Sequence, residues 1–138
     1  MIGNHCVKSW SSTQKSITLS SGEAELVAAV KTSTELIGLL QLMKDWQRDL
    51  EGRVMVDSSA AIGVVSRRGN GKLRHVKVGT LWIQERVEDG DLKVEKVDGA
   101  ENQADMMTKN VPVKKLDQFM DAMHQQFVTG RAEKSLKL

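Results

Sequence analysis

The chain has 138 residues, with 20 Lys and Arg against 18 Asp and Glu and a hydrophobic fraction of 40%. This length and composition predict a single domain with one modest core, and they argue against a low-complexity or wholly disordered chain. The formal net charge of +2 is too small to indicate nucleic-acid or membrane binding by itself, so such binding would have to come from local clusters of charge.

Cysteine usage and the N-terminal residues bear on the compartment. Cys6 is the single cysteine, so no internal disulfide partner exists, and His5, His75 and His124 lie too far apart for structural-zinc spacing. No stretch approaches about 18 consecutive apolar residues, and the start of the chain lacks the pattern of a secretion signal. We therefore expect a soluble intracellular protein, cytoplasmic or nuclear, that is not secreted and has no membrane partner.

The N-terminal part of the chain predicts an extended region followed by a long helix. Val, Trp, Thr and Ile are frequent over residues 5–19 and partly alternate with polar residues, which favours one or two strands. Ser20 and Glu23 then have capping-box spacing, with a hydroxyl at the N-cap and a carboxylate three residues later. Apolar residues three, four and seven apart extend this helix over about residues 22–46.

The rest of the chain alternates between predicted helices and strands. In order these are a short buried strand over 53–57, an Ala-rich helix over 58–65, a glycine-containing loop over 67–72, a helix over 78–87 with Leu81, Trp82 and Val87 inside, a strand over 92–97, a helix over 101–109 and an amphipathic helix over 116–127. This order implies an α/β domain over residues 1–128, with a mixed sheet covered by helices, and a polar, disordered tail over 129–138.

Three acids fall where an α/β sheet places functional groups. Glu25 is in the first turns of a helix, Asp57 ends a strand, and Asp105 is on a helix that follows another strand. Carboxylates that are brought together repel one another unless hard divalent cations lie between them, and oxygen ligands favour Mg²⁺ or Mn²⁺. Two such ions can activate a water and stabilise the leaving oxygen of a phosphodiester, so the three acids suggest nuclease chemistry.

Each acid also has a simpler interpretation. Glu23 is explained as the capping-box acid, which favours Glu25 as the metal ligand. Asp57 is equally suited to N-cap the helix that follows it, because Asp is a common N-cap residue. Asp105 taken alone is typical of a solvated acid on a helix.

A cluster of cations lies in the predicted loop and just after it. Five cations occur within eleven residues with no acid among them, and glycines at 69 and 71 would let the backbone approach a phosphate. The alternative is a solvated basic loop, which the sequence favours about equally. The candidate nucleic-acid-binding residues are Arg67, Arg68, Lys72, Arg74 and Lys77.

Five segments, in order, resemble one family. Residues 9–28 closely resemble the "SW-S-KQ-TVALSSTEAEY-A" segment of the ribonuclease H domain in copia-type LTR-retrotransposon Pol polyproteins. Residues 56–62 resemble its "DNQSAI", residues 74–76 its "KHI", residues 83–90 its "IRE-VEDG" and residues 101–109 its "EN-ADILTK". The likeness runs from about Met1 to His124.

The resemblance implies a ribonuclease H-like fold and activity. It makes Glu25, Asp57 and Asp105 the catalytic, metal-binding acids, acting with two Mg²⁺ or Mn²⁺ ions in the intact domain. The implied reaction is hydrolysis of the RNA strand of an RNA–DNA hybrid. The implied partners are the hybrid and the other parts of a Pol polyprotein, including the reverse transcriptase.

The chain departs from the family pattern at three points. A fourth acid, an aspartate on the first strand, would precede the "SW-S-KQ" motif, so we expect that strand and most of the second to be missing. Their loss would leave residues 7–19 without a neighbour and expose one edge of residues 54–56. Unpaired buried backbone groups cost about 1–3 kcal/mol each against a total stability of about 5–15 kcal/mol, so a marginal or unfolded monomer is expected. The family's assisting histidine is absent from residues 96–100, and the role of His75 stays open.

Two further hypotheses accompany the enzymatic one. The chain could be a catalytically silent remnant that binds nucleic acid or a protein through its basic loop and exposed sheet edge. It could also be a truncated pseudogene product.

Overall fold

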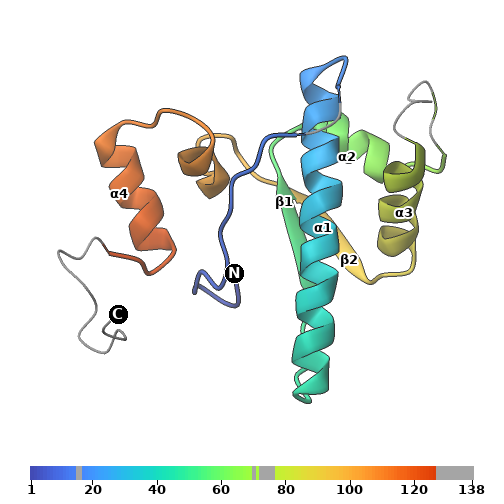
Figure 1. Cartoon of the computed structure of the whole chain (residues 1–138), viewed down its shortest axis with the longest axis horizontal. Helices are drawn as coiled ribbons and strands as arrows, with labels where there is room; N and C mark the ends of the chain where they lie inside the picture. Colours follow the sequence, from blue (N-terminus) through green and yellow to red (C-terminus); the bar gives the residue numbers. More distant parts are fainter. Residues whose placement is uncertain (15–16, 70, 72–76, 127–138) are drawn as a thin grey trace, which may run out of the picture. The chain divides into compact units, whose positions relative to one another are not determined.

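The computed structural model describes residues 1–14, 17–69, 71 and 77–126 (Figure 1). The chain divides into two compact units. The larger unit is Gln14–Asn102, and the smaller unit contains Met1–Thr13 and the chain from Gln103 onward. Most of the regular structure belongs to the larger unit.

Helices and parallel strands alternate in the larger unit. Its elements are α1 (Ser21–Asp45), β1 (Gly52–Val56), α2 (Ser59–Val65), α3 (Lys77–Glu88) and β2 (Leu92–Lys96). β1 pairs with β2 in parallel, from Gly52 opposite Leu92 to Val56 opposite Lys96. A parallel pair needs a long crossover connection, which α2 and α3 provide.

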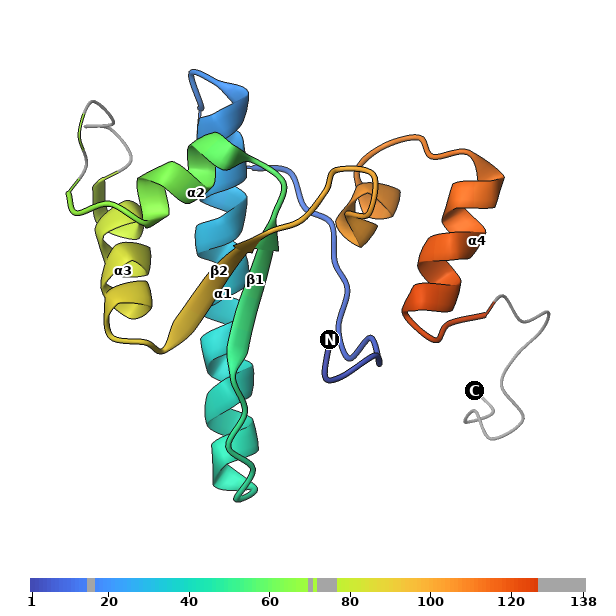
Figure 2. The same cartoon turned by 180° about the vertical axis from the view of Figure 1, so that it is seen from behind.

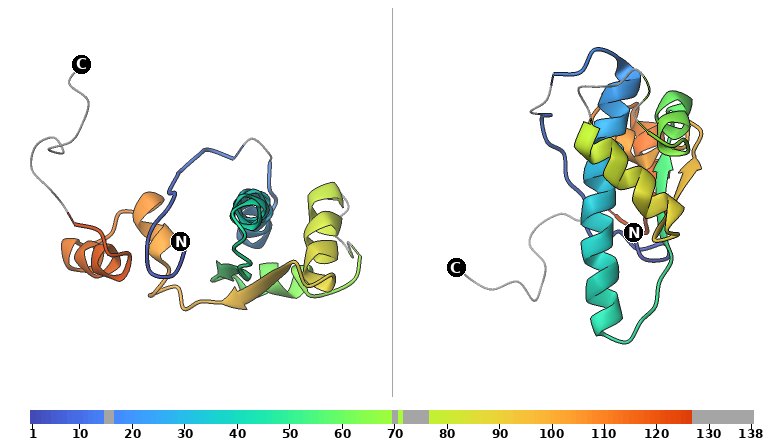
Figure 3. Two further views of the ribbon diagram at one scale, coloured as in Figure 1. Left: turned by 90° about the horizontal axis from the view of Figure 1, so that it is seen from below. Right: turned by 90° about the vertical axis from the view of Figure 1, so that its right-hand side faces the viewer.

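The helix α1 covers one face of the two strands. Seen along its axis it stands on one side of them (Figure 3, left), and the view from behind shows no helix of the larger unit over their other face (Figure 2). Burial therefore alternates along β1: Val54 and Val56 are buried, whereas Arg53 and Met55 are exposed. The prediction of a fully buried strand was wrong in this respect. The core combines Leu26, Ala29, Val54, Val56, Ala61, Val65 and Ile83.

The start of α1 confirms the predicted N-cap Ser20, whereas the Glu23 carboxylate bonds one residue before the position that a capping box requires. Ser20 is the N-cap, and its Oγ accepts a hydrogen bond from the Glu23 backbone N–H at 3.2 Å. The Glu23 carboxylate is buried and accepts from the Leu19 backbone N–H at 2.7 Å. By length and composition α1 could also cross a membrane, but the core helix of a soluble protein satisfies the same criteria.

Residues 5–19 do not form the expected strands. Within the described part of this segment the structure shows one isolated bridge, from His5 back to Ile2, and no strand over residues 6–14 or 17–19. Strands are held by backbone hydrogen bonds to a neighbour, so side-chain alternation alone does not create one.

Of the residues predicted on the inner side of α3, Trp82 and Val87 are partly buried against the core, whereas Leu81 is not. Thr80 and Ile83 are fully buried and Gln84 is 8% exposed, whereas Leu81 is 47% exposed. The buried positions 80, 83 and 84, together with the partly buried Val87, have regular helical spacing. Thr80 and Gln84 are polar, so a search for apolar residues alone misses them and includes the exposed Leu81 instead.

Up to residue 126, the smaller unit contains two short helices. The expected helix over 101–109 is a 3₁₀-helix, η2 (Gln103–Met107). It follows a turn in which the Glu101 N–H donates to the Asp98 carbonyl at 2.8 Å. A few residues later, Pro112 disfavours helical backbone at the residue that precedes it. The last helix is α4 (Val113–Ala122), which begins and ends earlier than predicted; Phe127 and the tail over 129–138 lie outside the described residues.

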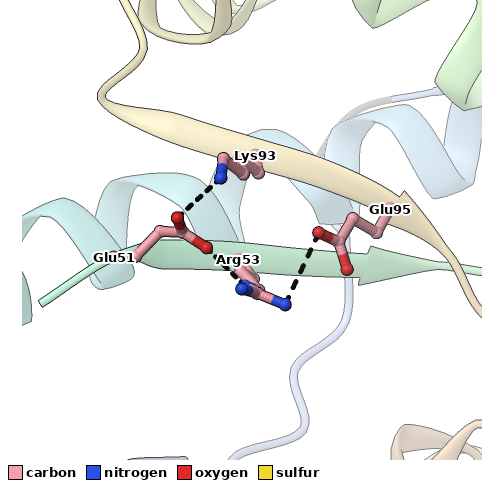
Figure 4. A network of polar contacts seen from close by, with 4 residues as sticks. All are labelled: Glu51, Arg53, Lys93 and Glu95. Carbon is pink, nitrogen blue, oxygen red and sulfur yellow. Dashed lines mark hydrogen bonds and ion pairs between the residues drawn. The ribbon is translucent and has the colours of Figure 1, made fainter.

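The open face of the strands carries a network of ion pairs. Glu51 lies just before β1, and its carboxylate accepts from Lys93 Nζ at 2.6 Å and from Arg53 Nε at 2.5 Å (Figure 4). Arg53 also lies 3.8 Å from Glu95. The hydrogen bond from Lys93, followed by that from Arg53, holds the pKa of Glu51 below its usual value.

This network predicts a measurable pH dependence. Because the pKa of Glu51 is lower when folded than when unfolded, its interactions stabilise the fold above the unfolded pKa and are lost as pH falls through the folded pKa. We expect Lys93→Met to raise the Glu51 titration midpoint in a carboxyl ¹³C NMR titration. Added salt should also raise the Glu51 titration midpoint, because it screens exposed ion pairs. A midpoint that does not respond to Lys93→Met would contradict the network.

Candidate functional site

Asp57 follows β1 directly, at the carboxyl end of a parallel strand. The Oγ of Ser58 accepts from the Ala61 backbone N–H at 3.2 Å, so Ser58 is the N-cap of α2. The alternative in which Asp57 caps this helix is therefore wrong. The Asp57 side chain is partly buried, and its Oδ2 accepts a hydrogen bond from Asn102 Nδ2 at 3.3 Å.

The segment after β2 passes beside Asp57. The Val97 N–H donates to the Val56 carbonyl at 3.1 Å, which continues the pairing of the strands up to Asp57. Lys96 Nζ donates to the Asp57 carbonyl and, at 3.0 Å, to Ser59 Oγ. A Cβ built on Gly99 would lie 3.8 Å from Asp57 Oδ2. Asp57 thus has an amide donor, an ammonium group and close backbone around it.

Glu25 and Asp57 lie on neighbouring segments of the larger unit. Glu25 is exposed in the first turns of α1. The start of α1 packs against the start of α2, because a Cβ on Gly22 would lie 3.1 Å from Ala60 Cβ and 4.0 Å from Ser58 Oγ. Ser58, which follows Asp57, is therefore close to Gly22, which lies three residues before Glu25.

Asp105 belongs to η2 in the smaller unit, where it is partly buried and pairs with Lys109 at 2.8 Å. Over the described ranges, no group of three His, Cys, Asp or Glu side chains is placed to hold one metal ion. Oxygen ligands are those that hard cations prefer, but neither unit completes such a site from its own described residues. The cluster of Glu25, Asp57 and Asp105 stays a prediction.

The predicted basic loop is described in part. Arg67 and Arg68 are exposed just beyond the end of α2, and Arg68 forms an ion pair with Glu88 of α3. Gly69 has φ +79° and Gly71 has φ +54°, values that favour glycine. Lys72, Arg74 and His75 lie outside the described residues, as does the side chain of Lys77.

Gln84 of α3 reaches the turn that contains the two arginines. Its Nε2 donates to the Val64 carbonyl at 2.7 Å and to the Gly69 carbonyl at 3.1 Å, and its Oε1 accepts from the Gly69 N–H at 3.0 Å. A surface cavity of about 420 Å³ lies here, lined partly by Arg67, Arg68 and Gln84.

Three neighbours of the candidate residues were not singled out from the sequence. Gln84 could have been found from the spacing of the buried positions on α3. Asn102 lies in the "EN-ADILTK" block, but nothing in that motif indicates a contact with Asp57. No sequence pattern indicated Lys96, because Lys96 and Asp57 are 39 residues apart and meet only where the two strands pair.

Comparison with known proteins places the chain among retroelement sequences. It is 38% identical over 112 residues to the retrovirus-related Pol polyprotein from transposon TNT 1-94 of Nicotiana tabacum. The match covers 79% of this chain and 8% of the length of that polyprotein. The chain is thus homologous to a small part of a retrotransposon Pol polyprotein. No family model and no solved structure matches the chain.

Proposed function

We propose that the chain corresponds to the ribonuclease H part of a copia-type Pol polyprotein and contributes to hydrolysis of the RNA strand of RNA–DNA hybrids. The observation that carries this proposal is the position of Asp57. It lies at the carboxyl end of a parallel strand, it is not the cap of the next helix, and its carboxylate is oriented by Asn102. The homology to a Pol polyprotein supports the retroelement origin on which the proposal builds.

Each of these residues would have a separate role in the reaction. The carboxylates of Glu25, Asp57 and Asp105 would hold two Mg²⁺ or Mn²⁺ ions, which supply water activation and leaving-group stabilisation when bound. Asn102 would keep Asp57 in one orientation. Lys96, whose Nζ bonds the Asp57 carbonyl, would supply a positive charge for a phosphate bound there. The exposed Arg67 and Arg68 would contact phosphates of the hybrid farther from the cleaved bond.

The test is Mg²⁺-dependent cleavage of a labelled RNA–DNA hybrid. The chain is assayed alone and joined to the segment that precedes the matched region in the tobacco polyprotein, because a fourth acid is expected from such a segment. We expect the joined protein to cleave only the RNA strand and to leave 5′-phosphate ends. Cleavage of neither strand in Mg²⁺ or Mn²⁺ would overturn the enzymatic proposal.

A second candidate is a catalytically silent binding module. It is favoured by the exposed Arg67 and Arg68, and by the edge of β1 that faces away from β2, which pairs with no strand in the part of the chain that is described. Salt-sensitive binding of the hybrid by the joined protein, without cleavage in either metal, would support this candidate.

A further inference from the structure

The side chain of Gln84 is a buried connection between α3 and the turn over residues 67–69. It is 8% exposed, although glutamine is mostly an exposed residue. Both ends of its amide are used: Nε2 donates to the Val64 and Gly69 carbonyls, and Oε1 accepts from the Gly69 N–H. Gln84 therefore binds the donor and the acceptor of one residue, Gly69, and fixes its backbone at two points.

The bonds of Gln84 satisfy backbone groups both at the end of α2 and in the turn. The carbonyls in the last turn of a helix have no partner within the helix, and Gln84 supplies one for Val64 of α2. Gly69 then takes the left-handed conformation, with φ +79°, and a Cβ added there would meet nothing within 4 Å. The bonds to Gln84 therefore hold Gly69 in this conformation, with open space beside its Cα.

A second connection from α3 is of a different kind. Arg68 pairs with Glu88, but 89% of the Arg68 side chain and 54% of the Glu88 side chain are exposed. Such a pair is weakened by salt, and a phosphate can compete with Glu88 for the guanidinium. The bonds of Gln84 are neutral and partly buried, so they do not depend on the partner of Arg68.

We propose that Gln84 is a positioning residue for nucleic-acid binding. By fixing the backbone of Gly69, it presents the guanidinium groups of Arg67 and Arg68 together to the phosphates of an RNA–DNA hybrid. A turn that is already ordered loses less conformational freedom on binding, which increases affinity without a direct contact. This inference rests on the proposed function, because it assumes that the hybrid contacts Arg67 and Arg68.

The first test measures binding of the full chain to a fluorescently labelled hybrid over a range of salt concentrations. In Gln84→Met the volume is kept and the hydrogen bonds are removed. We expect its dissociation constant to rise by about 3–10-fold and its salt dependence to become shallower, because fewer phosphates are contacted at once. The control is Gln41→Met: Gln41 is an exposed residue of α1 that bonds to Asp45, and we expect its replacement to leave binding unchanged.

A double-mutant cycle separates positioning from general destabilisation. In a background with Arg67→Ala and Arg68→Ala, Gln84→Met should cause no further loss of binding, because the groups that it positions are gone. Amide hydrogen exchange gives a readout that does not need nucleic acid. The Gly69 amide should exchange at least about tenfold faster in Gln84→Met, whereas amides of β1 should be unaffected.

A second variant acts on the turn without touching α3. Gly69→Ala adds a methyl group in open space but strains the left-handed backbone, so the fold is kept while the turn is disturbed. It should weaken binding as Gln84→Met does. Normal binding by both variants, while the double arginine variant loses binding, would overturn the role of Gln84 and leave the proposed function intact. Normal binding by the double arginine variant, or no binding by the unmodified chain, would show that the hybrid does not bind through Arg67 and Arg68. Both that part of the proposed function and the present inference would then be wrong.

Discussion

Asp57→Asn is expected to reduce Mg²⁺-dependent cleavage of the hybrid by the joined protein at least about 100-fold, with little change in hybrid binding. Asparagine has the same shape as aspartate, and its side-chain oxygen can still accept the hydrogen bond from Asn102. Ser58 continues to cap α2, so the helix that follows is not weakened. The substitution therefore removes one negative charge and leaves the local structure in place.

The control for Asp57→Asn is Asp117→Asn, because Asp117 is an exposed acid of α4 to which no role is assigned. Initial rates are measured in Mg²⁺ and in Mn²⁺, and binding is measured in the absence of divalent ions. Equal rates for Asp57→Asn and Asp117→Asn would remove Asp57 from the active site. Parallel losses of rate and of thermal stability would show that the effect of Asp57→Asn is structural.

Glu25 allows the same comparison on a single helix. Glu25 and Glu35 are both exposed acids of α1, and replacement by glutamine changes the charge by the same amount at each. Glu25→Gln should lower the cleavage rate about 10- to 100-fold, whereas Glu35→Gln should not. A weakened dependence on Mg²⁺ concentration in Glu25→Gln would link the loss to metal binding. Equal behaviour of the two variants would count against Glu25 as a ligand.

Features that depend on near neighbours in the sequence were predictable. The N-cap Ser20, the length of α1 and, to within one residue at each end, the strand predicted over 53–57 follow from capping and from residue periodicity. Pairings between distant segments were not. The contact of Asn102 with Asp57 and the bonds of Gln84 to residues at the end of α2 depend on the tertiary fold, which side-chain patterns do not encode locally.

The same reasoning explains the incorrect strands over residues 5–19. Their apolar residues alternate as in a strand, but a strand also requires a partner with free backbone groups. Among the described residues, β1 and β2 form a paired strand ladder, and residues 5–14 and 17–19 contribute only the isolated bridge of His5 with Ile2. The proposed gathering of Glu25, Asp57 and Asp105 is a tertiary arrangement of this type. It rests on the order of the motifs, not on any local pattern, and the cleavage experiments above test it.

Leu26→Ala is expected to lower the free energy of unfolding of the larger unit by about 2–5 kcal/mol. Leu26 is fully buried and belongs to the core formed with Val54, Val56 and Ile83. Its truncation would leave a cavity between α1 and the strands. A loss of this size is a large part of the total stability of a small domain, which is about 5–15 kcal/mol. Urea titration followed by far-UV circular dichroism measures it.

Leu42→Ala is the matched control, because it makes the same chemical change in the same helix at a side chain that is 45% exposed. Both variants alter helix propensity equally, so the difference between them reports burial alone, and we expect Leu42→Ala to cost less than about 1 kcal/mol. Leu26 also adjoins Glu25, so its packing fixes the turn of α1 that carries this acid. A joined protein with Leu26→Ala should therefore lose cleavage at temperatures where Leu42→Ala remains active. Equal stability of the two variants would show that α1 does not pack on the strands through Leu26.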